Sequence, residues 1–555
     1  MNSQLNAHTK NIDTLPLTKY YLAELGIYEL FKEFVPQGNA LVEPAEGLCI
    51  IINNLVNSRK PLYKIADWVA DYADGRGEAQ INASIFNHHR LSRDLDGLYA
   101  AERNSLMTRI SANAIRLHRL ETQRIHNDTT SLTLFGSYDN PGEGEVAQPA
   151  CGYNKDGHPD CKQIVFGLNI TEDGHVPLSY ETYNGNTTDS DTHKPNWDAL
   201  RQQLETEDFI YIADSKLCSI ENMAYIAEND GKFITLMPKN RKEVKKFHAR
   251  LKTHDIPWTF AFEKPNAHSK GSSTVYQIYD GEKTREKYRI TWVHSSAKAI
   301  TDEKARQKRI NDTRKNLVEL ASKLNRYNLK TRPQIKKALT EAIKPAKDYI
   351  NCKIIKDKAT VKKQMGRGKP GYNTKYREEV VVSFRLQWSI NEKAVAFSSG
   401  TEGVFPLVDN TELSAIDVLK TYKEQPYLEK RHSTLKSVLE VSPIFLKKPE
   451  RIEAILFLFF IALMIVSLIE RNIRANMTDA LPILPAGMKT ATPTWENIRY
   501  FFRNVHQIVV IKSGLVLKTS LKGMTKMHEQ LLKLLKVPIS IYKKLTERWW
   551  EFGST

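Results

Sequence analysis

Sixteen consecutive residues without a charge, Ala454 to Ile469, constrain the fold of this chain more than any other feature. A membrane span needs about 18 to 20 apolar residues. This run is shorter and ends at charges on both sides, with Arg451 and Glu453 before it and Glu470 and Arg471 after it. Such a run is typical of a helix that is buried on all sides inside a large core. We therefore expect a soluble protein with such a helix, and no membrane partner.

The length and composition describe a globular chain in several parts. A chain of 555 residues is too long for one hydrophobic core, so about two to four structural units are expected. Hydrophobic residues make up 41% and charged residues 26%, which argues against a disordered, collagen-like or multi-span membrane protein. Five cysteines cannot form a disulfide framework in so long a chain, and nothing at the amino terminus resembles a signal peptide. These features predict a reducing, cytoplasmic location.

The net charge is concentrated in one region. The chain has 81 basic and 64 acidic residues, which leaves +17. Residues 298 to 377 alone hold 24 basic and 7 acidic residues, and 24 − 7 = +17 equals the charge of the whole chain. This excess would repel itself without a polyanion, so it favours contact with nucleic-acid phosphates over a merely solvated helix.

The order of strands and helices from about residue 120 predicts an α/β fold. Three β-rich segments joined by short turns are followed by an alternation of helix and strand. The order βββαβαβ is that of the ribonuclease-H-like fold, a mixed sheet with flanking helices. The strands are expected at 125–135, 163–170, 176–183, 209–213 and 233–236, and the helices at 197–204 and 219–228.

The same patterns divide the chain into five segments. A helical amino-terminal domain is expected to serve in DNA binding or dimerisation, or else as a plain cap on the catalytic core, and a large basic insertion is expected to interrupt the sheet. Strands at 380–388 and 394–398 are expected to resume the core, and a helical tail follows. The predicted boundaries are 1–115 for the helical domain, 120–238 and 378–480 for the two parts of the core, 239–377 for the insertion and 481–555 for the tail.

Three carboxylates are candidates for metal-dependent chemistry. Asp128 lies in the first strand and Asp214 ends the apolar strand at 209–213, so adjacent strands would bring both to one edge of the sheet. Glu429 follows Pro426, which can start a helix. Each residue alone has an ordinary explanation as a cap, a turn residue or a solvated side chain. Together they form the oxygen-rich ligand set that Mg²⁺ prefers, and two such ions about 4 Å apart can promote an in-line displacement at phosphate.

The segment around Glu429 resembles a signature of the DDE transposases of bacterial insertion sequences. In that group the last carboxylate belongs to a pattern of Tyr, two residues, Arg, three residues, Glu, six residues and Lys. This chain has Tyr422, Glu429 and Lys436 at three of the four places and Gln425 at the place of Arg. Seven residues of α-helix fall about 20° short of two turns, so Glu429 and Lys436 should share one helix face. Segments 152–163, 185–189 and 212–214 are also similar to the family, and the resemblance spans roughly 120–475.

The resemblance implies a DNA transposase that cleaves strands at element ends and transfers the freed 3′-hydroxyl to target DNA. It implies two Mg²⁺ ions, with Mn²⁺ as an alternative, held by Asp128, Asp214 and Glu429. Its implied partners are double-stranded DNA, as element ends and as target, and further copies in a homodimer or larger assembly, in the nucleoid of the cytoplasm. The residues expected to contact DNA are Tyr422, Lys430, Arg431 and Lys436 around the signature and Arg367 and Lys369 in the insertion.

Two other functions remain open on the sequence. A metal-dependent nuclease on the same fold would cut DNA without joining it, and a protein with a decayed site would only bind DNA. Gln425 supports the decayed site, because an amide cannot offer the charged bidentate contact of Arg. If the family contact is made to DNA, Gln425→Arg should tighten binding or raise cleavage, unless Lys423, Lys430 and Arg431 already substitute for it.

Overall fold

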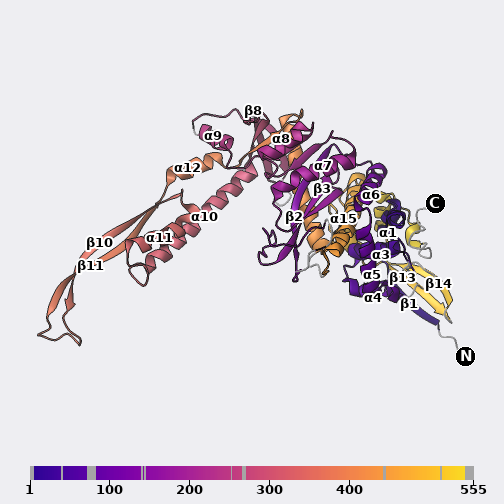
Figure 1. Ribbon diagram of the computed structural model, residues 1–555, viewed down its shortest axis with the longest axis horizontal. Helices are drawn as coiled ribbons and strands as arrows, with labels where there is room; N and C mark the ends of the chain where they lie inside the picture. Colours follow the sequence, from indigo (N-terminus) through magenta and orange to yellow (C-terminus); the bar gives the residue numbers. More distant parts are fainter. Residues whose placement is uncertain are drawn as a thin grey trace. The chain divides into compact units, whose positions relative to one another are not determined.

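The computed structural model describes residues 5–38, 42–71, 83–138, 142, 146–251, 253–265, 271–441, 446–512 and 515–543. The chain forms two compact units (Figure 1). The first unit contains Met1–Leu236, Asp409–Glu412 and Lys420–Thr555, and the second contains Met237–Val408 and Leu413–Leu419.

The sheet of the first unit has the strand order β4-β3-β2-β5-β6. β3 runs antiparallel to both β2 and β4, whereas β5 is parallel to β2 and β6. Parallel strands need a crossover, and helices α7 and α8 supply it. The predicted order βββαβαβ and the mixed sheet with flanking helices are confirmed. The elements are β2 (Arg124–Leu134), β3 (Lys162–Thr171), β4 (Pro177–Tyr183), α7 (His193–Leu204), β5 (Ile210–Ala213), α8 (Ile220–Glu228) and β6 (Lys232–Leu236).

The amino-terminal part of the first unit is mainly helical, as predicted. Asn87 illustrates how its helices begin, because the Asn87 side chain accepts a hydrogen bond from the N–H of Arg90 and so caps α5. A strand, β1 (Leu5–Asn11), precedes the helices. The helices are α1 (Leu15–Glu24), α2 (Ile27–Phe34), α3 (Pro44–Asn57), α4 (Ile65–Asp71), α5 (His88–Ala100) and α6 (Arg103–His118).

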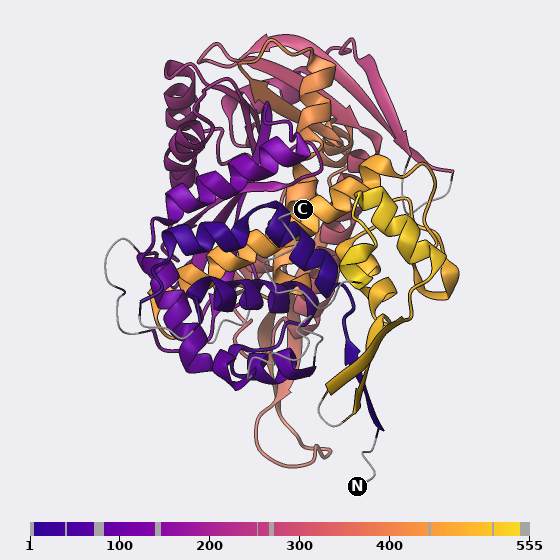
Figure 2. The ribbon, with the colours of Figure 1, turned by 90° about the vertical axis from the view of Figure 1, so that its right-hand side faces the viewer.

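The uncharged run at 454–469 lies in α15 (Pro449–Asn476), and every residue of the run is buried. The helix contacts α3, α5 and β4 of the same unit, and Figure 2 shows it in orange among the indigo and purple amino-terminal helices. Within the part of the chain that the structure describes, α15 alone is long and apolar enough to cross a membrane, and its most apolar stretch is fully buried. The prediction of a helix buried on all sides is confirmed.

The predicted helical tail at 481–555 is wrong in part. β13 (His506–Lys512) and β14 (Leu515–Lys522) pair with β1 in an antiparallel sheet of order β1-β13-β14. Val and Ile are enriched in β13, and these β-branched residues favour strands. The helices of this part are α16 (Trp495–Phe502), α17 (Lys526–Leu535) and α18 (Ser540–Lys543), while 544–555 lie outside the described residues.

The second unit contains a sheet portion of order β12-β9-β8-β7, a pair of helices and a long two-stranded ribbon. The ribbon is formed by β10 (Ile350–Gln364) and β11 (Tyr376–Ile390), and Figure 1 shows it together with α10 and α11. The other elements are α9 (Lys242–Arg250), β7 (Thr259–Pro265), β8 (Ser273–Lys283), β9 (Arg289–Ser295), α10 (Ser296–Lys323), α11 (Arg332–Ile343), α12 (Glu392–Thr401) and β12 (Val404–Asp409).

Two strands predicted to resume the core do not do so. Residues 380–388 belong to β11 and pair with β10 rather than with a core strand. Residues 394–398 lie in helix α12, where the Asn391 side chain accepts a hydrogen bond from the N–H of Ala394 and caps the helix. The sequence pattern identified the extended conformation of the first segment but not its partner, because pairing is set by the tertiary fold.

Candidate active site

Two carboxylates lie at the same edge of the first unit's sheet because of the register between β2 and β5. The two strands are parallel, and His126 is paired with Ile212 at the end of their ladder. Asp128 follows that pair by two residues on β2, and Asp214 follows it by two residues just past the end of β5. The structure therefore brings Asp128 and Asp214 together as the sequence predicted.

Both carboxylates lie in surroundings that disfavour their charge. The pKa of Asp128 is raised to about 7, mainly by burial and also by the charge of Asp214, while the Lys155 ammonium opposes the rise. Burial also raises the pKa of Asp214. Backbone N–H groups bind each side chain, from Thr129 to Asp128 at 2.8 Å and from Lys216 to Asp214 at 2.9 Å. Because the protein's own donors leave both pKa values high, an added cation would stabilise the ionised pair.

Asp189 and Lys155 extend this cluster, and the sequence analysis assigned them no role. Asp189 accepts a hydrogen bond from the Thr129 hydroxyl at 2.6 Å and lies 3.3 Å from the Lys155 ammonium. Its negative charge raises the pKa of both Asp128 and Asp214. Asp189 and Lys155 fall in segments that resemble the transposase family, and this resemblance was the only indication in the sequence that they belong to the site. Only the fold places them beside β2.

Glu429 lies on α14 (Gln425–Ser433), and this helix packs against β2, the strand of Asp128. Glu429 is exposed, whereas Tyr422, at the end of α13 (Ala415–Tyr422), is half-buried. Burial raises the pKa of the Tyr422 hydroxyl, and the charges of the three candidate carboxylates raise it further. The structure thus brings Tyr422 and all three carboxylates into one electrostatic neighbourhood.

Gln425 is buried and bound within the protein, so its side chain does not offer the exposed group that a DNA contact at this position would need. The His126 Nδ1–H donates to the Gln425 side-chain oxygen at 2.8 Å, and the Gln425 amide donates to the Asn127 carbonyl at 2.9 Å. Gln425 therefore fixes α14 to β2 directly before Asp128. The difference from the family signature does not remove a DNA contact, so it no longer supports a decayed site.

Arg431 is also turned inward, because it is 4% exposed and bound inside the first unit. Its guanidinium lies 2.6 Å from the Glu470 carboxylate of α15 and donates to the carbonyls of His175 at 2.8 Å and Gly174 at 3.0 Å. This burial argues against the predicted DNA contact of Arg431, since a basic residue next to a signature can turn inward. Lys430, the preceding residue, is exposed.

Lys436 lies 2.7 Å from Asp156, on the turn that follows α14. The prediction that Glu429 and Lys436 share a face assumed α-helix throughout, but residues Thr434–Val438 form a π-helical turn, which changes the angular spacing. His432 lies between them in sequence, 3.9 Å from Asp128. Burial lowers the pKa of His432 to about 3, so its neutral ring does not offset the charge of Asp128.

Arg367 and Lys369 are exposed in the turn that joins β10 and β11. They belong to the second unit, whereas the carboxylates belong to the first. Their predicted contact with DNA stays a prediction.

The donor set of the site fits a hard divalent cation. Among the described residues, no three Asp, Glu, His or Cys side chains are arranged to hold one metal ion together. Mg²⁺ commonly keeps several waters and uses one or two protein carboxylates together with substrate phosphates. Asp128 and Asp214, neighbours with raised pKa values, offer that kind of site, and exposed Glu429 offers a further oxygen ligand.

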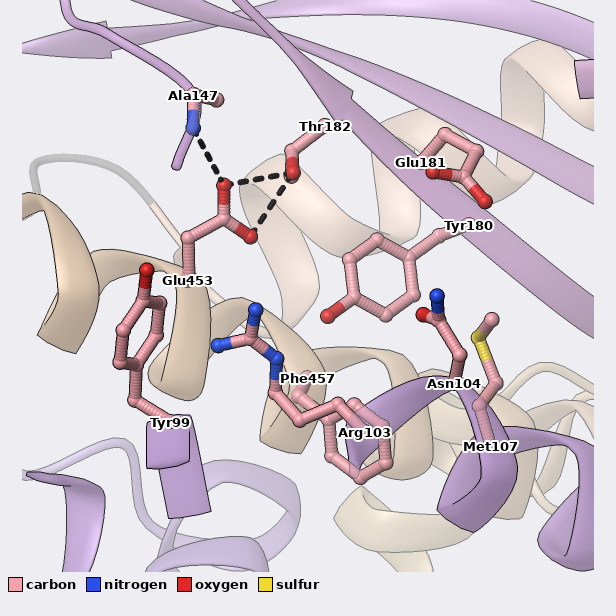
Figure 3. Close-up of a pocket in the computed structure, with 10 residues that line it drawn as sticks. All are labelled: Tyr99, Arg103, Asn104, Met107, Ala147, Tyr180, Glu181, Thr182, Glu453 and Phe457. Carbon is pink, nitrogen blue, oxygen red and sulfur yellow. Dashed lines mark hydrogen bonds between the residues drawn. The ribbon is translucent and has the colours of Figure 1, made fainter. Parts of the chain in front are cut away.

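A separate polar cavity of about 400 Å³ lies between α6, β4 and α15, and it contains none of the predicted site residues (Figure 3). In it, the Glu453 carboxylate accepts hydrogen bonds from the Thr182 hydroxyl at 2.7 Å and the Ala147 N–H at 3.1 Å. Glu181 also lines the cavity, and burial together with the charge of Glu453 raises its pKa to about 7.

Comparisons with known proteins agree with the resemblance found in the sequence. Residues 149–465 match the family model described as a transposase DDE domain, and residues 7–112 match a domain of unknown function (DUF4277). The first match includes Asp214 and Glu429 but begins after Asp128, so Asp128 is assigned by geometry. No curated protein matches the chain.

Six chains of solved structures match this chain, and one of them belongs to a cryo-EM structure of the piggyBac transposase synaptic complex with hairpin DNA. The sequence identity is 12% and the TM-score 0.27, over 50% of this chain and 61% of that chain. This chain therefore spans less than two thirds of the length of that protein, and so slight a likeness carries no argument here.

Proposed function

This chain belongs to the family with a transposase DDE domain, which covers more than half of its length, and from that membership we propose that it is a DNA transposase. It cleaves DNA strands at the ends of a mobile element and joins the freed 3′-hydroxyl to target DNA. The single observation that carries the proposal is the parallel pairing of β2 with β5, which brings Asp128 and Asp214 to one edge of the sheet, while the charge of Glu429 acts on the same Tyr422 hydroxyl as theirs.

Asp128, Asp214 and Glu429 are the proposed ligands of two divalent ions, Mg²⁺ or in its place Mn²⁺. Bound ions of this kind activate the attacking oxygen and stabilise the leaving oxygen in an in-line displacement. The chain's own part is to hold the three carboxylates in place. Gln425 fixes the helix of Glu429 against the strand of Asp128, and Lys155 partly offsets the crowded negative charge.

The surrounding basic and aromatic residues have proposed roles in holding DNA. Lys436 and Lys430 position phosphates beside the scissile one, and Tyr422 closes the site on its buried side. Lys436 would exchange its contact with Asp156 for a phosphate, since both are partly exposed. Arg367 and Lys369 bind the DNA backbone from the second unit.

The proposed partners are double-stranded DNA, both as element ends and as target, and further copies of the chain in a homodimer or larger assembly. A DNA substrate places the protein in the cytoplasm with the nucleoid. The pI of about 9.3 supports a polyanionic partner.

The test uses the purified full chain, a duplex carrying the inverted repeats that flank its gene, a supercoiled target and Mg²⁺. We expect 3′-hydroxyl ends at the repeat and joined products in the target, both lost when the divalent ion is chelated. Cutting without joined products would instead identify a nuclease. DNA binding without any metal-dependent cutting would identify a protein with a decayed site.

A further inference from the structure

The β10–β11 ribbon consists of an anchored base and a free outer half. At the base, Ile354, Leu386 and Trp388 pack against a core cluster that includes residues of α10 and α11. Asn325 fixes the ribbon there, because its amide donates to the Phe384 carbonyl at 2.9 Å and its oxygen accepts the Phe384 N–H at 2.7 Å. Residues 358–382, which we call the distal ribbon, lie beyond this base.

The distal ribbon exposes apolar side chains that a soluble protein normally covers. Val380, Val381 and Val382 are 62%, 45% and 41% exposed, and Val361 of the other strand is 47% exposed. A two-stranded ribbon is marginally stable by itself in water, and its open edges invite pairing with other chains. The distal ribbon is therefore a surface that is suited to a partner.

The positive charge of the distal ribbon indicates that its partner is negatively charged. It holds seven Lys and Arg residues, and none of the residues from Lys358 to Arg377 is acidic. Lys363 and Arg377 share Glu379 at 2.9 and 3.5 Å, but no described carboxylate forms an ion pair with Lys358, Lys362, Arg367, Lys369 or Lys375. A second copy would bring the same charge against itself, whereas a polyanion would neutralise it.

We propose that the distal ribbon inserts into the major groove of the DNA on which the chain acts, an inference that rests on the proposed function. The major groove is about 12 Å wide and admits a two-stranded ribbon. Seven residues of strand extend about 24 Å, which is more than half of a helical turn of about 34 Å. The basic side chains then reach phosphates on both sides of the groove.

The register places suitable side chains toward the base edges. Thr360 is paired with Val380, and Lys358 is paired with Val382, so these four residues lie on one face of the ribbon, three of them uncharged. Threonine and apolar side chains contact the methyl group of thymine in the major groove. The ribbon thus reads base edges in addition to binding phosphates, which distinguishes it from the basic face of α10.

The experiment measures displacement of groove-specific dyes from a short mixed-sequence duplex by the full chain. Methyl green occupies the major groove and netropsin the minor groove. The test variant replaces residues 359–381 by Asn-Gly, which forms a tight hairpin turn and shortens the ribbon. The control, Lys304→Gln/Lys308→Gln/Lys315→Gln, removes three exposed charges from α10 and leaves the ribbon intact.

At saturating protein, we expect wild type and the α10 control to displace methyl green but not netropsin. The shortened variant should still bind DNA but displace little or no methyl green. Three lost phosphate contacts in the control should only lower the slope of log K against log salt, by about 0.9 each. Circular dichroism checks that the shortened variant keeps its fold.

Three results would overturn the inference. The first is that the shortened variant displaces methyl green as wild type does, and the second is that wild type displaces netropsin instead. The third is that shortening changes the oligomeric state without DNA, which would assign the ribbon to contact with a second copy. Metal-dependent cleavage by the same wild-type sample is scored separately. Its absence counts against the proposed function, whereas the dye result tests the ribbon alone.

Discussion

The buried carboxyl of Asp128 shows how a single residue of the proposed active site can lower the stability of the folded protein. Its folded pKa is raised to about 7, mainly by burial. A carboxyl whose pKa is raised by folding contributes stability that is present at low pH and is lost as pH rises through the folded pKa. Near pH 8 without divalent ions, the ionised side chain should therefore destabilise the protein.

We predict that Asp128→Asn raises the melting temperature at pH 8 in metal-free buffer and abolishes DNA cleavage. The amide keeps the shape of the side chain but removes the buried charge and a metal ligand. Asp160→Asn is the matched control, since Asp160 is exposed, and it should leave both values unchanged. A melting temperature that stays the same or falls, with cleavage retained, would remove Asp128 from the site.

Glu181 gives a second residue-scale prediction, in the cavity of Figure 3. Burial and the charge of Glu453 raise its pKa to about 7. Its contribution to stability is full below the unfolded pKa of about 4.3 and is lost as pH rises through about 7. We expect Glu181→Gln to be more stable than wild type at pH 8, with the difference vanishing toward pH 4, by thermal melting across that range.

The control for this variant is Glu207→Gln, at an exposed position of the same unit. It should follow the pH dependence of wild type. If Glu181→Gln also followed wild type at every pH, the cavity would not perturb the Glu181 carboxyl.

At the scale of elements, a buried ion pair joins α14 to α15. Arg431 lies 2.6 Å from Glu470, and the two side chains are 5% and 6% exposed. Removing one partner of a buried pair leaves the other charge uncompensated and costs about 3 to 5 kcal/mol. We predict that Arg431→Ala lowers the free energy of unfolding in urea by about that amount, whereas Lys430→Ala, at the exposed neighbour, changes it little. Equal effects of the two variants would contradict the structural role of Arg431.

The contact between α14 and β2 reverses the expectation for Gln425→Arg. The amide joins His126 and the Asn127 carbonyl, and an arginine would put a charge among buried groups. We expect a loss of at least about 2 kcal/mol of unfolding free energy and lower cleavage, while DNA binding falls less than cleavage does. Gln425→Glu also places a charge at this position, but with nearly the same side-chain volume, and so tests the effect of charge without that of size. Tighter DNA binding by Gln425→Arg would restore the interpretation that this position faces DNA.

The sequence predicts an element well when residues close together in the chain determine it, and poorly when its pairing partner lies far along the chain. The spacing of apolar residues along the chain indicates both the buried helix α15 and the succession of strands β2 to β6, so both were predicted correctly. The pairing of β11 with β10, and of β13 with β1, depends on partners far along the chain, and these were missed. For the same reason the inward turn of Arg431 and Gln425 was not visible, because spacing in a helix does not tell which face the core covers.

At the scale of the whole molecule, each unit has its own proposed task. The first unit holds the carboxylates on a rigid sheet edge, and the second holds most of the excess positive charge. Asp189 and Lys155 show that the site contains more than its three predicted carboxylates, since both act on the charge of Asp128. We therefore expect DNA cleavage to depend on divalent cations bound by these specific carboxylates, and not on the total number of acidic side chains near the site.

The most direct test of this central claim replaces each proposed ligand by cysteine and measures strand cleavage with Mg²⁺ and with Mn²⁺. A thiolate is a poor ligand for hard Mg²⁺ and a better one for softer divalent ions. We expect Asp128→Cys, Asp214→Cys and Glu429→Cys to be inactive with Mg²⁺ and to regain cleavage with Mn²⁺, while Asp160→Cys behaves as wild type with both. Full activity of any of the three with Mg²⁺ would contradict the proposed metal site.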